Sequence, residues 1–95
     1  MTVRWSRLAL EDIRSLRSYL NERNSNAGTR IARTITSTAD RLLSQNMMLG
    51  RTGRVPGTRE LVIPETPYIT PYRVRFGHIE ILRVFHHSQP WPNQL

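Results

Sequence analysis

Pro56-Gly-Thr-Arg-Glu-Leu-Val-Ile-Pro64 and Pro67-Tyr-Ile-Thr-Pro-Tyr-Arg-Val-Arg-Phe-Gly-His-Ile-Glu-Ile-Leu-Arg-Val-Phe-His-His87 are the two stretches of sequence that decide the fold. Their apolar residues alternate or cluster between proline and glycine, which is typical of consecutive strands joined by short turns. The predicted strands are Glu60–Ile63, Tyr68–Phe76 and Ile79–Phe85.

The second and third of these strands predict a hairpin. Alternation places Tyr72, Val74 and Phe76 on one face, and Gly77-His78 fits a two-residue turn because glycine accepts a positive φ. The third strand is apolar on both faces, which predicts a position inside the sheet. Pro71 removes a backbone donor from the ladder, so we expect a bulge there.

Two helices are predicted upstream, after a short strand at Val3–Trp5. Ser6 is a good N-cap, because its hydroxyl can accept a free amide of the first turn. A stripe at helical spacing predicts a helix of about 17 residues, with Glu11 and Asp12 near its positive end. The stripe residues are Ala9, Ile13, Leu16 and Leu20.

A second helix follows the polar break Asn24-Ser-Asn, where Ser25 or Asn26 can serve as the cap. So short a connection predicts an antiparallel helical hairpin. Met47-Met48-Leu49 is expected to pack against its end, before a glycine-rich loop that carries Arg51, Arg54 and Arg59. The stripe of the second helix is Ile31, Ile35, Ala39 and Leu42.

Length and composition limit the class of protein. The chain has 95 residues, which suits a single domain over 1–95 with one modest core. No apolar run is long enough to span a bilayer and Met1-Thr-Val-Arg lacks the apolar region of a signal peptide, so we expect no membrane partner and a cytoplasmic location. With no cysteine and only three histidines at unsuitable spacing, we expect no metal and no cofactor.

Charge points to an acidic partner. The net charge is +7, and all 14 cationic side chains are arginine, so chemistry that depends on lysine is excluded. A nucleic acid, a nucleoprotein or an acidic peptide would complement this charge. The surplus is spread along the chain, and no helix-turn-helix or other reader motif is visible. A plain nucleic-acid-binding module is therefore disfavoured.

One strand, two helices and three strands in this order resemble the ParE/RelE superfamily of toxins from bacterial type II toxin–antitoxin modules. The resemblance covers nearly the whole chain and is stronger to the ParE side, through Pro56-Gly-Thr-Arg-Glu-Leu-Val, Tyr68-Ile, Tyr72-Arg-Val and Ile81-Leu-Arg-Val-Phe-His. It implies an α+β fold of order β-α-α-β-β-β, with a mostly antiparallel three-strand sheet covered by the helical hairpin. It also implies a cognate antitoxin that silences the toxin, and an acidic, amphipathic antitoxin segment would complement the positive charge.

The target of such a toxin is either DNA gyrase or the ribosome. ParE toxins inhibit gyrase by binding it, whereas RelE toxins are ribosome-dependent ribonucleases that cut mRNA. Ribonuclease members commonly place an arginine directly after the aromatic residue or histidine that opens the second long strand. In this chain Ile69 follows Tyr68, so the arginine is absent. Its absence favours growth inhibition by binding to gyrase, and we then expect no catalytic residue.

The ribonuclease alternative remains open because of the last strand. Some ribonuclease members have a proton-transfer histidine or tyrosine at its end, and His87 falls near that place with a side chain of the type commonly used for proton transfer. Arg59, Arg73 and Arg83 would then have to converge as phosphate contacts.

Under the binding hypothesis, these side chains instead belong to contact surfaces. Arg14 and Arg17 lie away from the apolar stripe of the first helix, and Ser88-Gln89-Pro90-Trp91 departs from the usual ParE ending. That departure raises the further alternative of a weakened toxin. The candidate contacts for target or antitoxin are Arg14, Arg17, Tyr72, Arg73, Arg83, His86 and Trp91.

Overall fold

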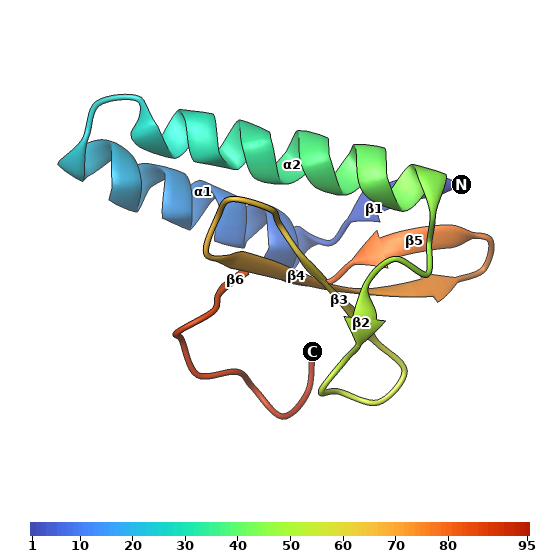
Figure 1. Cartoon of the computed structure of the whole chain (residues 1–95). Coiled ribbons are helices and arrows are strands. Elements are labelled where there is room, and N and C mark those ends of the chain that lie inside the picture. The colour runs from blue at the N-terminus through green and yellow to red at the C-terminus, as the bar shows by residue number, and fades with distance from the viewer.

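In the computed structural model, which describes all residues from 1 to 95, two antiparallel helices cover one face of a six-stranded sheet (Figure 1). The C-terminal tail folds back beneath the other face. The expected α+β fold is thereby confirmed. The elements, in chain order, are β1 Thr2–Trp5, α1 Arg7–Arg23, α2 Ala27–Gln45, β2 Arg51–Thr52, β3 Arg59–Val62, β4 Tyr68–Arg75, β5 His78–Ile81 and β6 Phe85–His86.

The sheet has the strand order β1-β5-β4-β3-β2, and β6 pairs with β4 beyond the end of β5. Only β1 and β5 are parallel, and the connection between them is long, since the helical hairpin and the strands β2, β3 and β4 all lie between them in the chain. The third predicted strand is therefore inside the sheet, with β1 on one side and β4 on the other. The sequence missed the short strand β2, whose two residues pair with Glu60 and Arg59.

The β4–β5 turn differs by one residue from the prediction. Arg75 pairs with His78, so the turn residues are Phe76 and Gly77, with φ of 51° and 76°. Positive φ at both positions is the geometry that matches the twist of the flanking strands. Phe76 consequently leaves the inner face and is 86% exposed, and Val74 beside it is 41% exposed.

The bulge expected at Pro71 is absent from β4, so that prediction is wrong. The register of Pro71 with β3 is regular, and its carbonyl accepts a hydrogen bond from the Leu82 amide at 2.9 Å. The irregularity lies opposite, in residues 82–84, because Tyr72 pairs with Ile81 but Ile69 pairs with Phe85. Proline offers no donor to that side, so the predicted strand Ile79–Phe85 is divided into β5 and β6.

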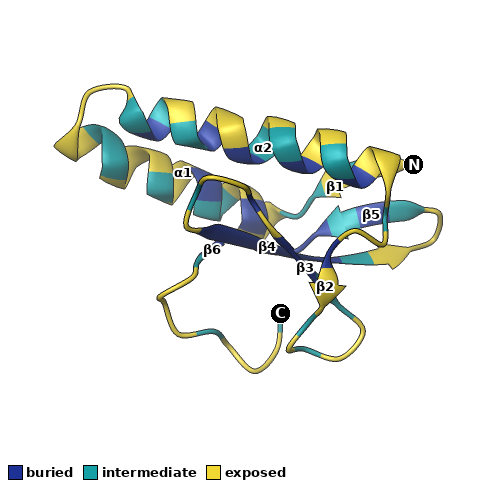
Figure 2. Cartoon of the chain, in the orientation of Figure 1, coloured by how far each residue is buried: buried dark blue, intermediate teal, exposed yellow.

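The core lies between the helices and the sheet (Figure 2). The predicted stripe of α1 faces it, with Ala9 and Ile13 buried and Leu16 packed at its margin. In α2 the buried face is turned slightly from the prediction, so Ile31 and Leu42 are only half-buried. The fully or largely buried side chains of α2 are Ala32, Ile35, Ala39 and Leu43.

The helix ends explain how the hairpin closes. The Ser6 hydroxyl accepts the Ala9 amide at 3.0 Å, which confirms the predicted cap of α1. At α2, Asn26 occupies the cap position but makes no side-chain bond. The side chain of Asn21 replaces it, since Oδ1 accepts the amides of Gly28 and Thr29 at 2.8 and 3.2 Å. Neither helix is long and apolar enough to cross a membrane.

Candidate functional site

The three arginines proposed as a phosphate clamp do not converge. Arg59 Nη1 donates to the Gly50 carbonyl at 2.8 Å on the helix-covered side of the sheet. Arg73 follows Tyr72 in β4 and therefore points to the opposite face, where it donates to Glu80 Oε1 at 2.8 and 3.1 Å. Each guanidinium is thus engaged by a different partner, and no joint phosphate site forms.

Arg83, the third candidate, ties the sheet to α1. It makes a two-pronged contact with the Asp12 carboxylate, with distances of 2.8 and 3.0 Å. Asp12 Oδ2 also accepts the Val84 amide at 2.9 Å. Hydrogen bonding to Asp12 raises the pKa of Arg83. Asp12 therefore holds the irregular segment between β5 and β6 against the helix, a role that its position near the helix start did not reveal.

The two histidines at the end of the sheet have different surroundings. His86 is half-buried, lies edge-on to Tyr68 at 5.5 Å between centroids, and its Nδ1 lies 2.7 Å from the Ser88 hydroxyl. His87 is exposed and stacks on His86 at 4.8 Å. Its backbone amide donates to the Pro67 carbonyl at 2.8 Å, but its ring contacts no arginine by a hydrogen bond.

Tyr72 does not lie on any contact surface, contrary to its selection as a contact residue. It is completely buried, and its hydroxyl donates to the Met47 carbonyl at 2.8 Å while accepting the Gly50 amide at 2.9 Å. Burial raises its pKa. Tyr72 therefore joins β4 to the chain that leaves α2, since its aromatic ring fills the core and its hydroxyl satisfies two loop groups.

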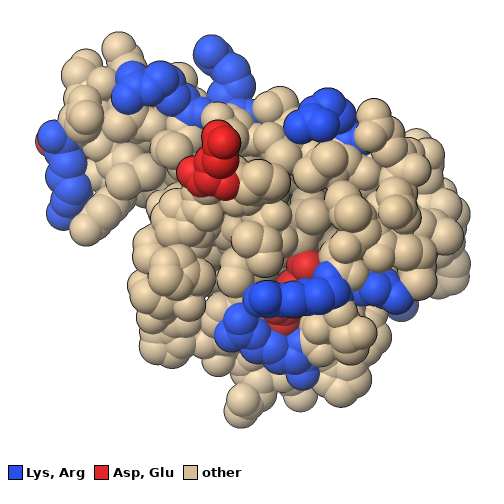
Figure 3. Space-filling view, viewed as in Figure 1, with Lys and Arg blue, Asp and Glu red and all other residues tan.

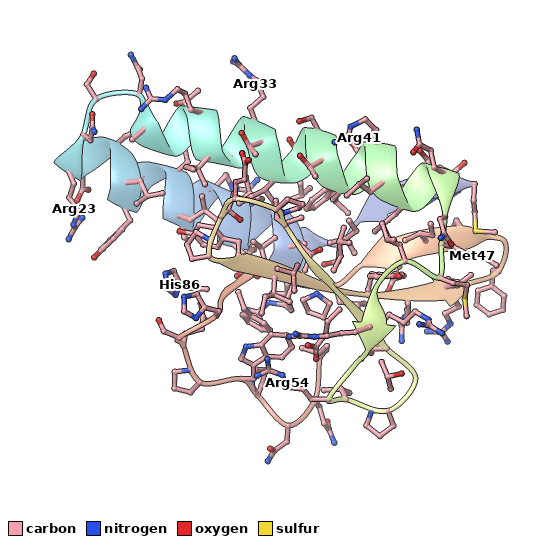
Figure 4. The ribbon with its side chains drawn as sticks, in the orientation of Figure 1. Arg23, Arg33, Arg41, Met47, Arg54 and His86 are labelled. Atoms are coloured by element: carbon pink, nitrogen blue, oxygen red, sulfur yellow. The ribbon has the colours of Figure 1, made fainter.

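The C-terminal tail is held on the open face of the sheet by Trp91. Its ring lies 4.7 Å from that of Phe85, and the Arg54 guanidinium covers it at 3.7 Å. Its indole N–H is buried without a hydrogen-bond partner, so packing and the cation–π contact hold it. Figure 4 shows Arg54 among the side chains between the tail and the β2–β3 loop.

Beneath Arg54 lies Glu60, which is only 2% exposed. Its carboxylate contacts Arg51 at 3.1 Å and accepts the Arg54 amide at 2.8 Å, while Arg54 Nε lies 3.4 Å away. A buried carboxylate requires such partners. In the sequence, Glu60 is the one charged residue of an otherwise apolar predicted strand. That position could have indicated a buried carboxylate with arginine partners, but the sequence analysis does not predict this cluster.

Replacement of Trp91 by alanine is expected to lower the free energy of unfolding by about 2 kcal/mol, less than for a fully buried tryptophan because the ring is partly exposed. The loss should appear as an earlier midpoint in urea denaturation. Gln94→Ala, at an exposed tail position, is the matched control and should leave the midpoint unchanged. Equal midpoints for both variants would show that the tail does not contribute to the fold.

Arg14 and Arg17 are exposed on α1, as expected, and neither contacts a carboxylate. Arg33 and Arg41 project outward from α2 in the same way (Figure 4). Figure 3 shows basic side chains spread over both layers, with acidic atoms beside those below the sheet. The outer surface of the helical hairpin is therefore positively charged, without a single dominant basic patch.

A groove of about 780 Å³ runs between the C-terminal half of α1 and the β6 end of the sheet. Leu16, Tyr19 and Leu20 form its helical wall, while Tyr68 and His86 lie on the sheet side. The groove could not be predicted from the sequence, because its walls come from segments about fifty residues apart. Its size and apolar lining suit a peptide segment better than a small substrate.

Comparison with known proteins gives the family. The model of the ParE toxin of type II toxin–antitoxin systems matches residues 3–91. Protein Y4kP of Sinorhizobium fredii, provisionally named a toxin, is 37% identical over 93 residues, which cover 98% of this chain and 95% of that protein.

Two solved structures extend the comparison. The chromosomal ParDE system of P. aeruginosa has a chain with a TM-score of 0.83 and 26% identity, covering 90% of this chain and 95% of its own. The RelBE2 toxin–antitoxin complex of Mycobacterium tuberculosis has a chain with a TM-score of 0.67 and 25% identity, and the match covers 93% of this chain and 92% of that one. This chain therefore belongs to the ParE toxin family of type II toxin–antitoxin systems, within the ParE/RelE superfamily.

Proposed function

We propose that this toxin acts in the cytoplasm, where it arrests growth by binding DNA gyrase and is neutralised by a cognate antitoxin. The observation that carries the proposal is the separate engagement of Arg59, Arg73 and Arg83, because a ribonuclease needs cations gathered around the scissile phosphate. Gyrase is the target that the resemblance to ParE toxins implies.

Ile69 gives further support to a binding mechanism. It stands where ribonucleases of the superfamily commonly carry an arginine, and it is only 5% exposed. Its backbone neighbours are Val62 on one side and Phe85 on the other, so its environment is apolar. An arginine could not replace it there without burying an unpaired charge.

The groove beside α1 is the surface that we propose for the antitoxin. An amphipathic antitoxin segment would place its apolar side chains against Leu16, Leu20 and Tyr68. Acidic residues on its other side would meet the exposed arginines of the helices, including Arg14 and Arg17. One segment could in this way use both the apolar groove and the net charge of the toxin.

The alternative function is ribosome-dependent cleavage of mRNA. The observation that favours it is His87, whose imidazole is exposed and stacked on His86 at the end of the sheet, together with the similarity to the RelBE2 complex. In this mechanism the ribosome would have to supply the cations that this chain does not gather itself.

The test is pulse labelling of DNA and protein synthesis within minutes of induction without antitoxin, using the wild type and His87→Ala. The gyrase proposal expects DNA synthesis to fall first and His87→Ala to keep its toxicity within about twofold, since a general acid–base residue would be worth at least about 100-fold. The purified wild-type toxin should also inhibit supercoiling by gyrase.

An early collapse of protein synthesis that His87→Ala abolishes, in a variant that keeps the wild-type melting temperature, would contradict the gyrase proposal. If soluble toxin accumulates and neither synthesis changes, the altered tail has cost the toxin its activity. The two readouts therefore separate a different target from an inactive toxin.

A further inference from the structure

The tip of the β4–β5 hairpin presents an aromatic side chain that the fold does not use. Phe76 is 86% exposed, the highest value among the exposed large apolar residues. Its backbone is left-handed, with φ of 51°, and Gly77 follows with φ of 76°. The β4–β5 turn lies at the end of the molecule opposite the α1–α2 turn (Figure 1).

Local physical chemistry disfavours phenylalanine at this position. Turns with positive φ at both central residues strongly prefer Asn-Gly, Asp-Gly or Gly-Gly, and a bulky residue there is a genuine outlier. An exposed ring also gains nothing from burial in the core. A residue that breaks a local rule without a compensating gain in stability marks a candidate functional position.

The surroundings of Phe76 define the chemistry of a partner. The Arg75 guanidinium lies 5.2 Å from the ring centroid, and Arg75 pairs across the hairpin with His78. Met1 and Val74 are also exposed at this end, since Thr2 pairs with His78 and Val74 with Ile79. The tip is therefore an apolar projection with a basic margin, which complements an apolar pocket bordered by carboxylates.

This projection is distant from the groove that we assign to the antitoxin. The groove includes Pro67 and Tyr68, at the start of β4, whereas Phe76 follows its last residue. Phe76 lies eight positions after Tyr68 along the strand, or about 26 Å at about 3.3 Å per residue. An antitoxin segment in the groove would leave the hairpin tip free.

We propose that Phe76 anchors the toxin to its target protein by inserting into an apolar pocket with an acidic margin. The proposal rests on the proposed function for the identity of that protein, gyrase, but not for the role of the hairpin. Single aromatic side chains in desolvated pockets commonly dominate the energetics of an interface.

The decisive variant is Phe76→Asn, because asparagine is the residue that this turn prefers. The melting temperature should rise by roughly 4 °C, while affinity for purified gyrase falls at least about 30-fold and growth arrest is lost. Higher stability together with lost activity cannot be explained by misfolding. Binding is measured by surface plasmon resonance with the gyrase holoenzyme, and activity by supercoiling and colony formation.

Two controls complete the experiment. Phe76→Tyr keeps the ring and should retain affinity for gyrase within about threefold. Leu10→Gln removes an apolar side chain that is 42% exposed in the first turn of α1, which begins beside Ile81 at the end of β5 away from the hairpin tip, and should leave both binding and growth arrest unchanged. Loss of activity in Leu10→Gln as well would show that any loss of exposed apolar area has this effect, and would overturn the specific role of Phe76.

The outcomes separate this proposal from the proposed function. If the wild type arrests growth without binding gyrase and Phe76→Asn abolishes the arrest, the hairpin role stands and the gyrase assignment fails. If Phe76→Asn arrests growth like the wild type, the hairpin role is overturned. It is also overturned if the wild type neither binds gyrase nor arrests growth, or if Phe76→Asn loses only the binding of a single-stranded oligonucleotide, since the ring would then stack on bases.

Discussion

Replacing Tyr72 by alanine is expected to lower the free energy of unfolding by about 4 kcal/mol, the middle of the range for large aromatic residues in cores. The ring is completely buried between the sheet and the chain that leaves α2. Its removal would leave a cavity and would also deprive the Gly50 amide and the Met47 carbonyl of their partner. Because total stabilities are about 5–15 kcal/mol, this loss would remove a large fraction of the stability of the fold.

The measurement is the free energy of unfolding from urea denaturation followed by circular dichroism. Tyr72→Phe is the matched control, since it keeps the ring and removes only the hydroxyl, and it should cost about 1–3 kcal/mol. The comparison separates the contribution of packing from that of the hydroxyl. If Tyr72→Ala lost no more stability than Tyr72→Phe, the ring would not be a core residue.

Replacing Gly28 by valine is expected to cost about 3 kcal/mol, the upper part of the usual range for overpacking. A Cβ at this position would lie 2.1 Å from the Arg17 carbonyl oxygen and 2.8 Å from its Cα, both of which belong to the backbone of α1. Backbone cannot rotate away as a side chain can, so the helices would have to separate. Separation would also break the bonds from Asn21 to the start of α2.

The effect of Gly28→Val is measured as a fall in the denaturation midpoint and in helical circular dichroism. Ser37→Val introduces the same residue at an exposed position of α2 and should cost less than about 0.5 kcal/mol. Gly28→Ala should fall between the two, because it has the Cβ alone. A Gly28→Val variant as stable as the wild type would show that α2 does not approach the backbone of α1 closely at Gly28.

Several features of the fold could be predicted because they depend on residues close together in the chain. The Ser6 cap, the length of α1 and the existence of the β4–β5 hairpin all follow from local spacing, and the structure confirms them. The hairpin turn was misplaced by one residue, since Gly77 could be read as either turn position. Phe76 is therefore a turn residue rather than a strand residue, and for this reason its side chain is exposed.

The candidate site was harder to predict, because a side chain's partner is set by distant segments. The sequence predicts Arg83 as a phosphate contact, but Asp12, seventy-one residues earlier, accepts its hydrogen bonds. Tyr72 was selected as a contact residue, but the loop after α2 buries its hydroxyl. The type of a residue shows which interactions its side chain can make, and only the packing shows whether its functional group is already engaged by another residue.

The sequence by itself determined the order of the elements, the mostly antiparallel sheet beneath a helical hairpin, and the ParE/RelE resemblance. The order of the elements follows from the period of apolar residues and from short connections, both of which are local properties of the chain, whereas the sheet beneath the helical hairpin is what the resemblance implies. Only the tertiary structure decided that Asn21 caps α2, that Glu60 and Arg54 hold the tail through Trp91, and that Phe76 stands exposed at the far end of the sheet. Each of these depends on which side chains distant segments bring into contact, and that information is absent from any local pattern.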